Sequence, residues 1–160
     1  MDRKPVLILG IGNLLFKDDG IGLHVIERLK NMSLSPDVEI IEGGIAAFDI
    51  VYLIENRKKV IVLDSVKADG TPGTIYRFTG NDIEEKRKDY LKSPAEAEFL
   101  DYFKTTRLMG TAPDKLVFIG VEPDDTGNKN GKLEIALSPT LEQKIPEIIE
   151  MVMKEIRTSY

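Results

Sequence analysis

The sequence contains no cysteine, and this absence excludes several kinds of chemistry at once. A chain without thiols forms no disulfide, has no thiolate nucleophile and cannot hold zinc through cysteine. The absence is consistent with a cytoplasmic protein, which is the location we expect. No apolar run approaches the roughly 20 residues that span a bilayer. The charged segment 1–5 lacks the apolar core of a signal peptide, so we expect no membrane association and no secretion signal.

An excess of positive charge is also absent, because 27 acidic residues outnumber 22 basic ones. The 160 residues carry a net charge of -5, which disfavours nucleic acid as a partner because such binding depends on neutralising phosphates. Hydrophobic residues make up 42% and charged residues 31%, a balance typical of a folded chain rather than a disordered or membrane-embedded one. The length suits one domain, and we expect residues 1–160 to form it.

Histidine occurs once, as His24, and this scarcity argues against two common hydrolase mechanisms. The chain has no Gly-x-Ser-x-Gly elbow, and a single histidine on a separate element makes no Ser–His–Asp triad. It also lacks the His-Glu-x-x-His pair of zinc proteases. The spacing from Val25 places His24 near the edge of a buried helix face, so we interpret it as a partly exposed residue rather than a ligand.

A dinucleotide-binding loop is nearly present but incomplete. Gly10-Ile11-Gly12 follows an apolar run, yet the position of the third glycine in that fingerprint is Leu15. Asp18 and Asp19 stand where such a loop would hold a pyrophosphate, and their charges would repel it. We therefore expect no organic cofactor.

Apolar runs and helical spacings alternate along the chain. Continuous apolar runs predict buried strands at residues 6–9, 38–41, 59–64 and 116–121, and an alternating run predicts an edge strand at 74–78. Helical spacing predicts helices at 20–29, 46–54, 93–108 and 138–156. Residues 82–92 are ambiguous between a loop and a helical turn, and 122–132 are expected to form a solvated acidic loop. The prediction is an α/β fold of three layers (α/β/α), with a mostly parallel sheet of about five strands and helices on both faces.

Acidic residues follow several of the predicted strands, at Asp18, Asp19, Glu42, Asp64 and Glu122. The carboxyl ends of parallel strands meet at one edge of a sheet, where the sites of α/β proteins gather. Oxygen atoms from two elements at that edge can hold a divalent metal, which makes Asp19 and Asp64 a candidate pair. The alternative is structural, with Asp18 and Asp19 capping the following helix and Asp64 bonding loop amides. These residues alone leave both interpretations open.

Residues 10–22, Gly-Ile-Gly-Asn-Leu-Leu-Phe-Lys-Asp-Asp-Gly-Ile-Gly, resemble the opening signature of the hydrogenase maturation endopeptidases. The similarity continues in order over most of the chain, through Glu42-Gly43-Gly44, the strand ending in Asp64, Pro72-Gly73-Thr74, Ser93-Pro94, and residues 116–121 with Pro123. The first motif is fairly specific, and the others are informative only together.

The resemblance implies an endopeptidase that removes the C-terminal extension of a nickel–iron hydrogenase large-subunit precursor after nickel insertion. It implies that the nickel belongs to the substrate and serves recognition, with Asp19 and Asp64 as its carboxylate ligands and as catalytic residues. The glycine loops at Gly12-Asn13 and Gly43-Gly44 would line the substrate cleft. The implied partner is the precursor, and we expect a monomer that docks it.

One position departs from the family pattern. The family's histidine follows the Ser-Pro pair directly, and here that position is Ala95, which cannot bind metal. Glu96 and Glu98 are the nearest candidates for a third, oxygen ligand, and both are otherwise ordinary surface glutamates. Such a replacement would favour harder cations than nickel. Two further hypotheses therefore stand: a binding module that holds a precursor without cutting it, and a peptidase of this fold that acts on another protein.

Overall fold

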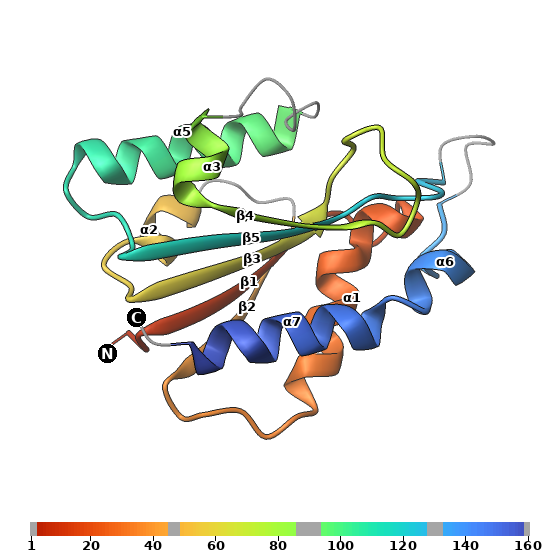
Figure 1. The fold of residues 1–160 in the computed structure, drawn as a ribbon, viewed down its shortest axis with the longest axis horizontal. Helices are drawn as coiled ribbons and strands as arrows, with labels where there is room; N and C mark the ends of the chain where they lie inside the picture. Colours follow the sequence, from red (N-terminus) through yellow and green to blue (C-terminus); the bar gives the residue numbers. More distant parts are fainter. Residues whose placement is uncertain (1–2, 45–48, 86–93, 128–132, 159–160) are drawn as a thin grey trace.

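The computed structural model describes residues 3–44, 49–85, 94–127 and 133–158 (Figure 1). Its sheet has five strands in the order β2-β1-β3-β5-β4. Four of them run parallel: β1 (Val6–Ile11), β2 (Val38–Gly44), β3 (Lys59–Ser65) and β5 (Lys115–Val121). The fifth, β4 (Ile75–Thr79), pairs antiparallel with β5 at an edge. The predicted five-stranded, mostly parallel sheet and its edge strand are confirmed.

Helices cover both faces of this sheet, which confirms the three-layer prediction (Figure 1). One face carries α1 (Ile21–Lys30), α6 (Pro139–Glu142) and α7 (Ile145–Arg157), and the other carries α2 (Ile50–Ile54), α3 (Gly80–Glu85) and α5 (Pro94–Leu108). A short 3-10 turn, η1 (Lys17–Gly20), joins the β1 loop to α1. None of the described helices is both long and apolar enough to cross a membrane.

Two hydrophobic cores follow from the alternation of side chains along the buried strands. Val6 and Ile8 of β1 pack with α1 and α7, while Leu7 and Leu9 point the other way and pack with α2 and α5. Every residue of β3 is buried, because both of its faces are covered and both of its edges are paired. The last residues of this central strand, Asp64 and Ser65, therefore lie at the carboxyl edge of the sheet.

The C-terminal helix differs from the prediction. A single helix was expected over residues 138–156, and the structure has two, α6 and α7, with Lys144 between them as the N-cap of α7. Pro146 stands in the first turn of α7, where the missing N–H costs nothing, but it cannot continue a helix from before. The ambiguous stretch begins as α3, and residues 86–93 lie outside the described part.

Candidate active site

Asp19 and Asp64 both accept a hydrogen bond from Ser65. The hydroxyl of Ser65 donates a hydrogen bond of 2.9 Å to Oδ1 of Asp19, and its backbone N–H donates one of 2.7 Å to Oδ1 of Asp64. Asp64 is buried at 6% exposure near the end of β3, whereas Asp19 is half-buried on η1. The structure thus brings together the two carboxylates at the carboxyl edge of the sheet, one of them accessible from outside.

Ser65 is a residue of this candidate site that the sequence analysis did not single out. Its hydroxyl donates to the carboxylate of Asp19, so this serine is not part of a Ser–His pair. The signal was its position directly after Asp64, at the end of a fully buried strand. Its relation to the acid pair depends on its contact with Asp19, 46 residues earlier, which local sequence does not predict.

Gly12 allows the loop that carries Asp19 to pass close to β3. Its backbone has φ of 128°, and an added Cβ would clash with the carbonyl oxygen of Asp19 and lie 3.4 Å from Oδ1 of Asp64. Any side chain at this position would therefore push apart the two elements that hold the carboxylates. Gly12 is a structural requirement of the site rather than only a turn residue.

The other residues expected in the substrate cleft surround the same place. The N–H of Gly12 donates to the carbonyl of Gly44, which ties the β1 loop to the end of β2. Gly43 and Gly44 are half-buried, and an added Cβ at Gly44 would meet nothing within 4 Å, so open space lies beside it. Asn13 uses its side-chain oxygen within the loop, where it accepts from the N–H of Leu15 at 3.0 Å.

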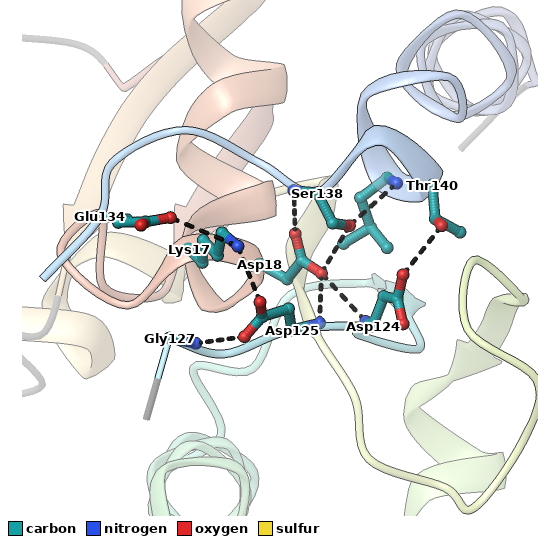
Figure 2. A network of polar contacts seen from close by, with 9 residues as sticks. Lys17, Asp18, Asp124, Asp125, Gly127, Glu134, Ser138 and Thr140 are labelled. Carbon is teal, nitrogen blue, oxygen red and sulfur yellow. Dashed lines mark hydrogen bonds and ion pairs between the residues drawn. The ribbon is translucent and has the colours of Figure 1, made fainter. Parts of the chain in front are cut away.

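Asp18 does not cap the helix, and this part of the structural alternative is wrong. The residue is fully buried, and its carboxylate accepts four hydrogen bonds: from the N–H groups of Asp124, Asp125 and Ser138 and from the hydroxyl of Ser138 (Figure 2). Neither Asp18 nor Asp19 supplies a side-chain cap to α1, whose N-cap is Gly20. Asp18 instead joins η1 to the segment between β5 and α6.

Two other acids expected at this edge are engaged elsewhere. Glu42 is exposed and forms an ion pair of 2.5 Å with Lys30 of α1. Glu122 is buried, and its Oε2 accepts 2.9 Å hydrogen bonds from the N–H of Ala68 and the hydroxyl of Tyr76. The prediction of a solvated loop is therefore wrong at its first residue, because Glu122 fastens the β5 end to the segments around β4.

The described residues contain no third ligand beside the two carboxylates. No group of three or more His, Asp or Glu side chains within the described ranges is arranged to hold a metal ion. Glu98 is exposed on α5 and accepts a 2.8 Å hydrogen bond from Tyr102, which raises the pKa of that phenol. His24 is half-buried, and its Nε2 contacts the carbonyl of Ile135 at 2.9 Å. Helix α5 begins at Pro94 as predicted, and the side chains of Ala95 and Glu96 lie outside the description.

Together these features define a three-layer α/β protein with a pair of carboxylates at the carboxyl edge of its sheet. A model of the hydrogenase maturation protease family matches residues 23–155. Hydrogenase 2 maturation protease of Escherichia coli is 31% identical over 156 residues, which cover 96% of this chain and 92% of that protein. The chain belongs to the hydrogenase maturation protease family.

Solved structures agree with this assignment. The hydrogenase-maturating endopeptidase HybD from E. coli superposes with a TM-score of 0.85 at 29% identity, over 95% of this chain and 91% of that one. The NiFe hydrogenase maturation protease HybD from Thermococcus kodakarensis superposes with a TM-score of 0.76 at 25% identity, over 95% and 99% of the two chains. The resemblance noted in the sequence is confirmed, and so is the interpretation of the chain as a peptidase of this type.

Proposed function

We propose that this protein removes a C-terminal extension from the large-subunit precursor of a nickel–iron hydrogenase, with Asp19 and Asp64 as the carboxylates of its active site. The observation that carries the proposal is the pairing of these two side chains around Ser65, in a chain of the hydrogenase maturation protease family. Asp64 lies on the buried strand β3, and Gly12 allows the loop that carries Asp19 to pass close to it.

The donor set fits a metal that arrives with the substrate. Two carboxylates provide oxygen ligands, fewer than a divalent cation requires, so the remaining ligands must come from elsewhere. A nickel ion already held by its precursor brings those ligands and needs only to be recognised. The half-exposure of Asp19 leaves this contact open to a large partner, whereas buried Asp64 is held by the Ser65 N–H group.

The first test is cleavage of purified precursor in its nickel-loaded and nickel-free forms, followed by mass spectrometry as the extension is lost. We expect cleavage of the nickel-loaded form alone. Asp19→Asn and Asp64→Asn should each reduce kcat/KM by at least about 100-fold, because each removes a charge that acts at the reacting centre. Glu42→Gln is the matched control, since this exposed acid at the end of β2 pairs only with Lys30 among the contacts described. Wild-type rates in both aspartate variants would contradict the proposal.

Ala95 favours a second candidate, a binding module that holds a precursor without cutting it. Alanine supplies no ligand at the position of the family's histidine. In the same assay, a stable complex without loss of the extension would support this candidate. If cleavage occurs, three variants test whether a glutamate supplies the third ligand. Loss of cleavage in Glu96→Gln or Glu98→Gln would identify that glutamate as the ligand. In that case Ala95→His should lower the rate, because the added histidine would compete with the glutamate.

A further inference from the structure

Large exposed apolar side chains lie on the loop that carries Asp19 and on a second segment that is hydrogen-bonded to this loop. The described part of the chain exposes nine such residues, and five of them lie on two segments that are more than 110 positions apart in sequence. We call these five the apolar patch; their exposures range from 37% to 62%, and they are Leu14, Leu15, Phe16, Leu133 and Ile135. The remaining four, Met32, Tyr52, Leu108 and Met109, lie on other elements.

Backbone hydrogen bonds hold the two segments of the patch side by side. The N–H of Glu134 donates to the carbonyl of Leu15 at 3.1 Å, and the N–H of Lys17 donates to the carbonyl of Glu134 at 2.8 Å. The carbonyl of Ile135 contacts His24 of α1. The buried carboxylate of Asp18 accepts hydrogen bonds from Asp124, Asp125 and Ser138, which lie on either side of residues 133–135 in sequence (Figure 2). The apolar side chains are therefore exposed on a fixed surface rather than on a frayed loop.

The lysine next to the patch is paired with acids of the same molecule. Lys17 forms ion pairs with Asp125 at 2.7 Å and with Glu134 at 3.3 Å (Figure 2). An uncharged partner surface can therefore approach without leaving the ammonium of Lys17 buried and unpaired. Large exposed apolar side chains on two segments held together by backbone bonds are a feature of interaction sites.

The patch is continuous with the proposed active site. The N–H of Asp19 donates to the carbonyl of Phe16 at 3.0 Å, and the N–H of Asn13 donates to the carbonyl of Asp19 at 3.3 Å, so one closed loop carries both the carboxylate and three patch residues. A protein substrate that brings its scissile peptide to Asp19 must cover the outer side of this loop. No other exposed apolar group in the described chain is connected to Asp19 in this way.

We propose that the apolar patch is the docking surface for an apolar segment of the precursor that is cleaved at Asp19 and Asp64. This inference rests on the proposed function, and it assigns the recognition of the protein substrate to Leu15 and Ile135 together with their neighbours. Docking then depends on apolar burial at the patch, while the carboxylates act on the reacting centre.

The test compares the double variant Leu15→Ser/Ile135→Ser with the matched control Leu108→Ser/Met109→Ser, which removes two exposed apolar side chains at the end of α5. Binding of the nickel-loaded precursor is measured by surface plasmon resonance, and cleavage by mass spectrometry. For the patch variant we expect KM and Kd to rise about tenfold while kcat changes less than about twofold, since uniform binding is lost and the chemistry is kept. The control should behave as the wild type, and thermal unfolding should be unchanged in both.

The outcomes separate this inference from the proposed function. If the wild type cleaves the precursor and the patch variant has the wild-type KM and Kd, the patch inference is wrong and the proposed function stands. If the wild type neither binds nor cleaves the precursor, both fail. Sedimentation velocity completes the test, because a wild-type dimer that the patch variant abolishes would show that a second copy of the chain covers the patch instead.

Discussion

At the scale of single residues, Ser65 contacts two aspartates that belong to different elements and that we propose as the active-site carboxylates. Asp18 and Asp19 are neighbours of the same chemical type, yet one is buried among four donors and the other is half-buried next to Asp64. The direction in which each side chain leaves the 3-10 turn decides its role. A buried carboxylate that accepts four hydrogen bonds contributes to stability, and a half-buried one with a single described donor keeps acceptor capacity for a ligand.

Gly12 offers a sharp test at this scale. Gly12→Ala should lower the free energy of unfolding by at least about 2 kcal/mol, because it adds left-handed strain to a clash with the carbonyl oxygen of Asp19. Gly44→Ala is the matched control, since its φ is 54° and an added Cβ meets nothing, so its cost should stay near about 1 kcal/mol. Urea unfolding measures both; equal losses would show that close packing at Gly12 is unimportant.

At the scale of elements, the site depends on how η1 is fastened to the rest of the fold. Lys17 and Asp18 both contact the segment between β5 and α6, which is more than 100 residues away in sequence (Figure 2). Ser138 contributes to two elements at once: it donates to Asp18, and its hydroxyl oxygen accepts from the N–H of Leu141 at the start of α6. The loop that carries Asp19 is therefore positioned by tertiary contacts and not by α1 alone.

Asp18→Asn should lower the free energy of unfolding by about 3 kcal/mol, because an amide places a donor among four donors and leaves buried groups unpaired. Asp124→Asn serves as the control, because its exposed side chain accepts a hydrogen bond from the hydroxyl of Thr140 and the change should cost less than about 0.5 kcal/mol. Chemical denaturation followed by circular dichroism compares the two. A loss at Asp18 no larger than that at Asp124 would contradict the role assigned to it.

At the scale of the whole molecule, strand β3 carries opposite charges at its two ends. Asp64 lies at the carboxyl edge, and Lys59 is buried at the amino edge, where its ammonium donates to the carbonyls of Glu155 and Thr158 and to the hydroxyl of Thr158. A hollow of about 690 Å³ lies beside Lys59, and it is lined by none of the proposed site residues. Its buried charges are engaged in holding the end of α7, so we place the site at the opposite edge.

Burial lowers the pKa of Lys59 below the ordinary lysine value of 10.5; the charge of Glu155 opposes this shift, and those of Lys115 and Arg77 add to it. The folded protein therefore releases this proton at a lower pH than the unfolded chain does. Between those two pKa values the unfolded chain binds more protons, so the contribution of Lys59 to the free energy of unfolding rises with pH. The free energy of unfolding of the wild type minus that of Lys59→Met should therefore become more positive from neutral pH towards 10.5, as measured by urea unfolding. A value that becomes more negative over this range would contradict the shift.

Much of this molecule could be predicted from local patterns. The apolar runs predicted the strands, the helical spacings predicted α1, α2 and α5, and the order of elements predicted a parallel sheet with two covered faces. These features follow from burial alone, because a strand covered on both sides must be apolar throughout. The placement of Asp19 and Asp64 at one edge follows from the same rule, since parallel strands end together.

The tertiary structure decided which acids remain at that edge. Asp18 and Glu122 accept hydrogen bonds from distant segments, and Glu42 forms an ion pair with Lys30. Three of the five acids predicted at this edge therefore have other partners than the proposed site. It also decided the break between α6 and α7 and the contact of Ser65 with Asp19. By itself the sequence determined most of the elements and the family, because these depend on burial and local spacing, and it predicted that Asp19 and Asp64 would lie at one edge of the sheet. The partners of each carboxylate depend on hydrogen-bond donors that only the folded chain brings within reach.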